Sequence, residues 1–171
     1  YDFLDNFIFP NKAITLKNRV VMAPTTLRAS FEDGSVTTDE LAYYQLRSKG
    51  VGLVIAEAAY VNPLGRGWEG AISIADDDKI PGLRRLASAI QSGGAKAVLQ
   101  LVAAGRQSTT TILRGEQPVS ASAQAYPHGE HEQPRALSHE EIAQNINDFA
   151  QATKRAILAG FDEIGRASCR E

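Results

Sequence analysis

The sequence has few of the features that mark metal-binding, membrane or nucleic-acid-binding proteins. Its single cysteine, Cys169, cannot form an internal disulfide and is not by itself a metal site. No apolar run reaches the ~18 residues of a membrane helix, and the N-terminal stretch YDFLDNFIFP has acidic side chains where a signal peptide has basic ones. A net charge of -2 leaves no basic excess to bind phosphate backbones. We therefore expect a cytoplasmic protein with neither a nucleic-acid nor a membrane partner.

Short apolar runs are present, and they predict strands. They lie at residues 19–23, 51–56, 96–102 and 161–164. None of the first three alternates between polar and apolar residues, as a strand with one face in water does, so both faces should be covered. This pattern favours a parallel sheet with helices against it. The hydrophobic content of 43%, with 22% charged residues, is that of a soluble domain.

The first two of three helical patterns lie between the first three apolar runs. Thr37 and Glu40 form a capping box before the first helix, which Gly50 should end. In the second helix, Asp78 is the expected N-cap and Pro81 is tolerated in the first turn. The apolar face of this helix is predicted to comprise Leu83, Leu86, Ala87 and Ile90.

The third helical pattern is the clearest. Ser138 and Glu141 form a capping box at its start, and Gly160 should end it. The residues predicted to line its apolar face are Ile142, Ile146, Phe149, Ala150, Thr153 and Ile157.

Repeated βα units form either an open doubly wound sheet or a (β/α)8 barrel. No G-x-G-x-x-G or G-K-[ST] sequence follows the first strand, as it usually does in nucleotide-binding open sheets. The stretch FIFPNKAITLKN predicts a hairpin around Pro10-Asn11 that would close the floor of a barrel. Because a complete barrel takes about 250 residues, the expected α/β fold is a partial (β/α)8 TIM barrel. It would comprise about three and a half βα units after a short N-terminal hairpin.

The connection at residues 103–137 is long and has one strand-like part, PVSASA. Connections beyond ~12–15 residues are uncommon unless they are functional or disordered. We expect this one to lie over the mouth of the barrel.

Active sites of such barrels lie at the carboxyl ends of the strands. Small side chains there leave room for a flat ring. The amide of Gln100 both donates and accepts, which suits an imide-like edge such as N3–H and C4=O of a flavin. Thr26 can donate to the C4=O or N5 region of such a ring.

The alternative is that these are ordinary solvated residues at the ends of the strands. The candidates at the predicted strand ends are Ala23, Pro24, Thr25, Thr26, Ala58 and Gln100.

Other motifs favour structural roles over metal or phosphate binding. His128 and His131 have ligand-like spacing but no third ligand nearby, which favours a solvated loop over zinc. The acidic residues 76–78 precede a helix, whose N-terminal dipole they would stabilise. Gly65-Arg66-Gly67 lacks the Lys-Ser/Thr of a P-loop and is interpreted as a turn. We therefore expect no metal site.

Six motifs occur in the order and spacing of one family, from about Phe3 to Phe161. They resemble the old yellow enzyme family, the FMN-dependent NADH:flavin oxidoreductases. The motifs are LKNRVVMAP, DGSVTTDELAYYQLRSKGVGLVIAEAAYVNPLGRG, IPGLRRLASAIQSGGAKAVLQL, AAGR, QPVSASA and PRALSHEEI.

The resemblance implies a barrel in which NADH or NADPH reduces FMN and the flavin passes hydride to a small-molecule acceptor, such as an activated alkene. Arg28 occupies a position where relatives often present an aromatic residue to the substrate. Glu57 matches a common residue of the family but receives no definite role, and no catalytic residue is assigned. The flavin contacts implied by the motifs are Ala23, Pro24, Thr25, Thr26, Ala58 and Gln100.

Two positions depart from the family pattern. The family's Q-L-x-H-A-G-R has Ala103 in place of its histidine here, and Gly165 stands where the family's substrate-holding histidine is expected. Residues 165–171 are interpreted as a tail foreign to the family. Residues 1–171 would then be the N-terminal part of a single FMN-binding barrel, and we expect this chain by itself to be inactive.

Two alternatives stay open. One is a catalytically silent half barrel that self-associates into a homo-oligomer through its unpaired sheet edges. The other is a different flavin-binding TIM-barrel enzyme.

Overall fold

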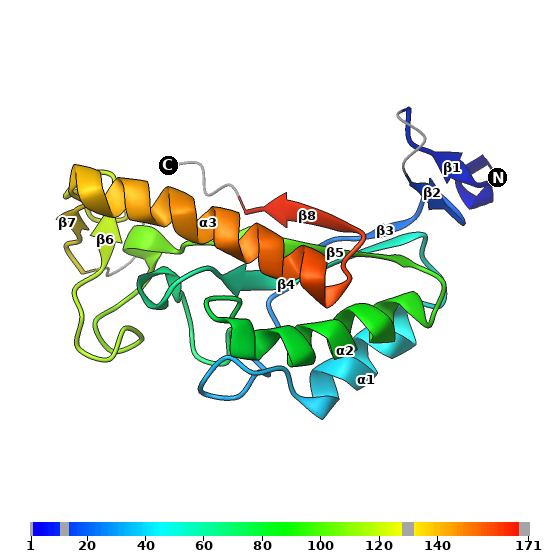
Figure 1. Cartoon of the computed structure of the whole chain (residues 1–171), viewed down its shortest axis with the longest axis horizontal. Coiled ribbons are helices and arrows are strands. Elements are labelled where there is room, and N and C mark those ends of the chain that lie inside the picture. The colour runs from blue at the N-terminus through cyan, green and yellow to red at the C-terminus, as the bar shows by residue number, and fades with distance from the viewer. Residues whose placement is uncertain (1, 11–13, 128–131, 168–171) are drawn as a thin grey trace.

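A four-stranded parallel sheet forms the centre of the molecule, in the order β3-β4-β5-β8. The computed structural model describes residues 2–10, 14–127 and 132–167. One helix follows each of the first three strands, so the predicted succession of βα units is present (Figure 1). The strands are β3 (Val21–Met22), β4 (Leu53–Tyr60), β5 (Lys96–Val102) and β8 (Glu163–Arg166), and the helices are α1 (Thr38–Arg47), α2 (Ile80–Gln91) and α3 (His139–Ala159).

Both predicted capping boxes are confirmed. The Thr37 hydroxyl accepts from the Glu40 backbone N–H at the start of α1, and Ser138 does the same for Glu141 at the start of α3. Gly160 ends α3 in the left-handed conformation with φ 89°. The expected stop at Gly50 was wrong, because α1 ends at Arg47 and its C-cap, Ser48, keeps right-handed helical geometry.

The start of α2 differs from the prediction. Asp78 was expected as the N-cap, but it lies inside a short 3-10 helix, η3 (Asp77–Lys79), and Lys79 occupies the cap position without a side-chain capping bond. The Asp78 carboxylate instead accepts from Lys79 Nζ at 3.1 Å. The predicted apolar face is confirmed, since all four of its members are buried: Leu83, Leu86, Ala87 and Ile90.

The predicted buried face of α3 was wrong. The helix packs on the sheet and α2 through small residues, Ala152, Ala156 and Ala159. Within the predicted face only Phe149 packs partly against the core, whereas Ile146 and Ile157 are 67% and 62% exposed. Alanines allow the helix to approach its neighbours closely, so the larger side chains are left on the outer surface.

The predicted N-terminal hairpin is confirmed by antiparallel pairing of β1 (Phe7–Ile8) with β2 (Thr15–Leu16). Its expected turn at Pro10-Asn11 includes Asn11, which lies outside the described residues. Ile14 and Leu16 cluster with Leu53 of β4 and Val98 of β5, near the start of each strand. The hairpin therefore covers the amino end of one sheet face, where a barrel floor would lie (Figure 1).

The long connection after β5 crosses the opposite end of the sheet. It contains a 3-10 helix, η4 (Gly105–Gln107), and two short strands that pair in parallel, β6 (Val119–Ser120) and β7 (Arg135–Ala136). The strand-like PVSASA therefore corresponds to β6, whereas β7 was not predicted. Figure 1 shows both strands beyond the carboxyl ends of the main sheet.

The two faces of the sheet have different coverings. The main core lies on the helix side, where Val54 and Leu99 pack with residues of α2 and α3. The opposite face, here called the inner face, has the hairpin at its amino end. Towards its carboxyl end, Ala58, Tyr60 and Val102 pack with Trp68 from the loop after β4. None of the helices in the described part of the chain is long and apolar enough to cross a membrane.

Candidate functional site

Three neighbouring strands bring small and amide side chains side by side near their carboxyl ends. Ala58 of β4 is the register partner of Gln100 of β5, which in turn pairs with Gly165 of β8. Ala58 is buried, and Gln100 is partly buried. The structure therefore brings together two of the residues predicted from the sequence, Ala58 and Gln100, and places Gly165 beside them.

A bulge in β4 determines which of its residues faces the inner side. Ile55 pairs with Val98, but the next pair is Ala58 with Gln100, so β4 contains one residue more than β5 over this interval. Without the bulge, alternation would place residue 57 on the inner face. With it, Leu53, Ile55, Ala58 and Tyr60 join inner-face clusters, and the carboxyl-bearing Glu57 does not.

The segment after β3 leaves the sheet early. β3 pairs with β4 only at Val21 and Met22, and further along β4 its place is taken by Ser73, which bridges to Tyr60. The released chain exposes most of the predicted rim residues: Ala23, Thr25 and Thr26 are exposed, and Pro24 is partly buried.

A buried carboxyl ties this segment back to β4. Glu57 Oε2 accepts from the Leu27 backbone N–H at 3.0 Å. Leu27 directly follows Thr26, and Glu57 directly precedes Ala58. This bond ties the segment next to Thr26 to β4, although no hydrogen bond joins the Thr26 side chain to Gln100 among the described residues.

Arg28 follows in an unusual backbone conformation. Its φ of 56° lies in the left-handed region that favours glycine. A Cβ on Gly70 would lie 2.4 Å from the Arg28 carbonyl oxygen, so the two backbones meet where only glycine fits. The Arg28 side chain is exposed, which leaves it available to a ligand at this rim.

Glu57 belongs to a polar cluster that the sequence analysis did not identify. Glu57, Glu40 and Tyr44 are each 0% exposed, and the Glu57 backbone N–H donates to the Tyr44 hydroxyl at 2.8 Å. Burial raises the pKa of Glu57 to about 7, the Leu27 N–H opposes this, and the nearby Glu40 raises it further. Burial also raises the pKa of the Tyr44 hydroxyl far above its usual value. One signal was available: Glu57 is the only charged residue in the apolar run of β4.

The loop after β4 is hydrogen-bonded to α3 at the carboxyl end of the sheet, here called the rim. Asn62 donates through Nδ2 to Asp148 Oδ2 of α3 at 2.7 Å and accepts through Oδ1 from the Gly65 N–H at 2.8 Å. A cavity of about 460 Å³ lies between this loop, β6 and the first turns of α3. Ala103, at the first departure from the family pattern, lines it.

The position of Gly165 is open to a side chain. A Cβ there would meet Val98 Cγ1 at 3.8 Å and the Leu99 oxygen at 4.0 Å, which are ordinary contacts. The missing histidine at this departure therefore does not reflect a lack of space for its Cβ.

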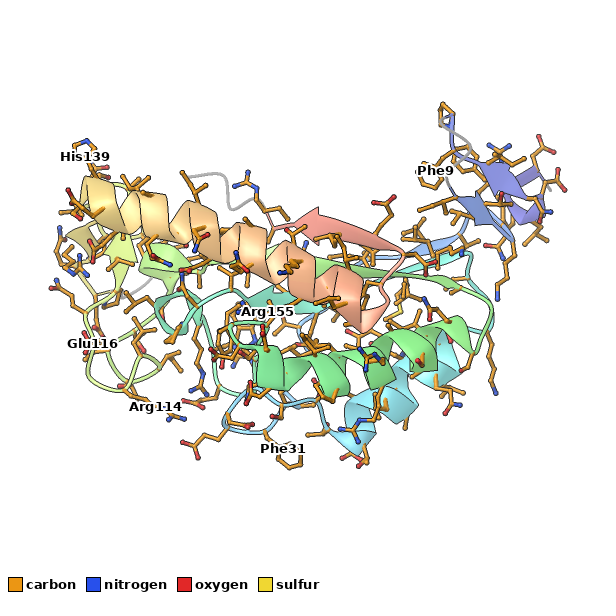
Figure 2. All side chains as sticks on the ribbon, in the orientation of Figure 1. Phe9, Phe31, Arg114, Glu116, His139 and Arg155 are labelled. Carbon is orange, nitrogen blue, oxygen red and sulfur yellow. The ribbon has the colours of Figure 1, made fainter. Side chains whose placement is uncertain are left out.

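The remaining sequence candidates have structural partners. Arg66, within Gly65-Arg66-Gly67, is buried and donates to Glu69 at 2.6 Å. Asp77 pairs with Arg155 at 2.7 Å, and Figure 2 shows Arg155 reaching from α3 towards the start of α2. His128 and His131 lie outside the described residues, and the described part of the chain contains no group of three or more metal-ligating side chains.

The rim offers a defined chemistry. It combines a flat floor of small residues, one carboxamide, exposed hydroxyls on an anchored segment and one exposed cation. Such a surface can lie against a planar ring and exchange hydrogen bonds with polar atoms along its edge. Gln100 and Thr26 can donate where negative charge accumulates, and Gln100 can also accept from a ring N–H.

Comparisons with known proteins agree with this description. The sequence model of the NADH:flavin oxidoreductase / NADH oxidase family matches residues 9–166. An NADH:acrylate oxidoreductase of Vibrio harveyi is 43% identical over 161 residues, which cover 94% of this chain and 16% of that protein. The probable NADH-dependent flavin oxidoreductase YqiG of Bacillus subtilis is 41% identical over 151 residues, which cover 88% of this chain and 40% of the relative.

A solved structure shows the same arrangement. The old yellow enzyme homologue from Zymomonas mobilis superposes with a TM-score of 0.85 at 29% identity, over 97% of this chain and 48% of that one. The chain thus spans less than half the length of each of these three relatives.

Proposed function

Because the chain belongs to the NADH:flavin oxidoreductase / NADH oxidase family, we propose that it is the N-terminal part of a single FMN-binding barrel in an oxidoreductase. Its fold is a partial (β/α)8 barrel of the old yellow enzyme type. The observation that carries the proposal is the register that aligns Ala58 with Gln100 on the inner face. Residues 165–171 are proposed to be a tail outside the family pattern.

The residues at the rim fit one edge of a flavin. Ala58 and the unsubstituted Gly165 flank Gln100, so no bulky side chain stands between the amide and a ring lying across the strands. Gln100 would hold the N3–H and C4=O edge, and Thr26 would donate to the C4=O or N5 region. The backbone and side chains of residues 23–25 would lie along the same edge of the ring.

When bound, FMN supplies two-electron hydride transfer from NADH or NADPH to an acceptor. We propose an activated alkene as the acceptor class, in keeping with the NADH:acrylate oxidoreductase that this chain resembles. Arg28 lies on the same segment as Thr26 and is the candidate to attract an anionic acceptor or donor. Its side chain is exposed and its backbone is fixed against Gly70.

Replacing Gln100 by alanine tests the proposal. Because only one edge of the ring is addressed, we expect the chain to purify colourless and to bind added FMN weakly, as measured by FMN fluorescence polarisation. Gln100→Ala should weaken that binding about 5- to 150-fold, which corresponds to the ~1–3 kcal/mol of an unmade buried hydrogen bond.

The matched control is Gln151→Ala, which makes the same change on the exposed surface of α3. It should bind FMN as the original chain does. Equal affinities of the two variants, or no FMN binding by the original chain, would contradict the proposal.

Self-association is a second candidate property, and a specific observation favours it. β3 and β8 are the edges of the main sheet, and the outer face of α3 exposes isoleucines. Unpaired edges and apolar surface promote contact between chains. We propose that a self-associated form of residues 1–171 is catalytically silent, since these residues correspond to about half of a related barrel enzyme.

A further inference from the structure

We propose that Glu57 and Glu40 form a buried carboxyl pair that shares one proton and positions the rim segment, defined here as residues 23–30. The role in flavin binding rests on the proposed function. The positioning itself is a property of the chain and can be measured without flavin.

The two carboxyls hold the rim segment at two points. Glu57 Oε2 accepts from the Leu27 N–H at 3.0 Å, and Glu40 Oε1 accepts from the Ser30 hydroxyl at 2.7 Å. A third bond, from the Ser30 N–H to the Gly70 carbonyl at 3.2 Å, comes from the loop after β4. Arg28, with its left-handed backbone, lies between these points. The contacts therefore fix the part of the segment that follows Thr26.

The pair is itself rigidly held. Glu40 Oε2 accepts from the Thr37 N–H at 2.6 Å and from the Thr37 hydroxyl at 3.0 Å, as part of the α1 capping box. The Glu57 N–H, released from the strand ladder by the bulge, donates to the Tyr44 hydroxyl at 2.8 Å. Both carboxyls thus have fixed positions between β4, α1 and the rim segment.

The charge of this cluster requires a proton. Both glutamates are 0% exposed, and no partner of either carboxyl in the described part of the chain is a cationic side chain. The titratable side chains that face Glu57 are Glu40 and Tyr44 of α1, while Arg28 contributes its backbone. Two ionised carboxylates in this position would repel each other in a desolvated site.

Glu57 Oε1 is the natural place for that proton. It is buried and has no hydrogen-bond partner among the described residues. When protonated, Glu57 can donate to Glu40 while Oε2 keeps the Leu27 N–H. Loss of the proton places a negative charge on Glu57 in a desolvated site beside the Glu40 carboxyl, so the rim segment should loosen as Glu57 ionises.

Cleavage by trypsin after Arg28 measures how firmly the segment is held, because the bond must open locally before the protease can act. The cut is identified by mass spectrometry in the full 171-residue chain. Rates are divided by those of a free peptide of residues 23–33, which removes the pH dependence of trypsin itself. Glu57→Ala should be cut at least about tenfold faster, since it loses a buried hydrogen bond to a backbone amide.

Glu57→Gln shows whether the effect of Glu57 depends on its proton or only on the volume of its side chain. Glutamine can accept from Leu27 and donate to Glu40, as protonated glutamate does. At pH 6 it should be cut at the rate of the original chain. Between pH 6 and 8.5 the corrected rate of the original chain should rise, whereas that of Glu57→Gln should stay constant. The matched control is Glu163→Gln, an exposed strand position that should follow the original chain at every pH.

A second variant tests the bond between the rim segment and Glu40. If Glu57→Ala does not fold, Ser30→Ala removes only the bond to Glu40 and should still speed cleavage. Equal rates for Ser30→Ala and Glu163→Gln, or identical pH profiles for the original chain and Glu57→Gln, would overturn the shared-proton pair.

FMN binding then separates the two proposals. If the original chain does not bind FMN, the proposed function fails while the cleavage result still decides the pair. If Glu57→Ala loosens the segment but leaves FMN affinity unchanged, the link between the pair and the flavin is overturned.

Discussion

At the scale of single residues, Glu57 shows how one bulge changes the role of a strand. The extra residue turns a carboxyl away from the inner face and aligns Ala58 with Gln100 instead. The inner face is therefore free of a buried carboxyl group. The Glu57 carboxyl lies instead between β4 and α1, where it accepts a hydrogen bond from the Leu27 backbone amide of the neighbouring segment.

The raised pKa of Glu57 predicts a pH-dependent stability. Its value of about 7 in the folded chain exceeds its usual 4.5, so the folded state binds the proton more tightly than the unfolded state. The stabilisation is fully present below pH 4.5 and is lost as the pH rises through about 7. A difference of this size corresponds to about 3 kcal/mol.

Urea unfolding of the original chain and Glu57→Gln between pH 4.5 and 8 measures this effect. The free energy of unfolding of the original chain should fall relative to that of the variant across the range. Asp33 and Glu141 have pKa values lowered to about 2, so their contributions change at more acidic pH and are common to both proteins. Parallel curves would show that Glu57 is ionised in the folded chain.

Much of this local chemistry is not visible in the sequence. The Thr37 and Glu40 capping box is a short-range pattern and could be predicted, but the further bond from Ser30 to Glu40 joins residues ten positions apart. The bulge in β4 depends on packing against its neighbours. Gln100 could be proposed for the rim because alternation along a regular strand fixes its face.

At the scale of elements, the ends of α1 and α3 differ in backbone geometry. Gly160 ends α3 at φ 89°, and a Cβ there would meet no atom within 4 Å. Gly160→Ala should therefore lower stability through backbone strain alone, by about 1–2 kcal/mol. Urea unfolding at one pH measures the loss.

Gly50→Ala is the matched control, because Gly50 also has open space around a Cβ but does not have a positive φ. It should leave stability unchanged or raise it slightly. A loss equal to that of Gly160→Ala would mean that the left-handed geometry is not the cause.

The elements that could be predicted are those with local signals. β5 has the predicted bounds, and α3 begins and ends at its predicted caps. The buried face of α3 could not be predicted from apolar periodicity, because the helix contacts its neighbours through Ala152, Ala156 and Ala159. Close helix packing favours small side chains, which have little weight in a hydrophobic pattern.

At the scale of the whole molecule, the exposed face of α3 predicts self-association. Ile146 and Ile157 are 67% and 62% exposed, and β3 and β8 are the edge strands of the main sheet within the described residues. Burying one isoleucine is worth about 1.5–3 kcal/mol, so several of them can hold two chains together. We expect the weight-average sedimentation coefficient to rise with concentration, above the value for a single chain of 18.4 kDa.

Two double variants of α3 identify the surface responsible. Ile146→Glu with Ile157→Glu should keep the chain monomeric at the same concentrations, because both side chains point to solvent and their loss leaves the core intact. Asn147→Glu with Gln151→Glu adds the same charge at exposed polar positions of α3. This control should associate more strongly than the isoleucine variant, because it keeps both isoleucines. If the isoleucine variant associates as strongly as this control, the sheet edges and not α3 mediate the contact. A monomeric original chain at every concentration would exclude the silent, self-associated half barrel.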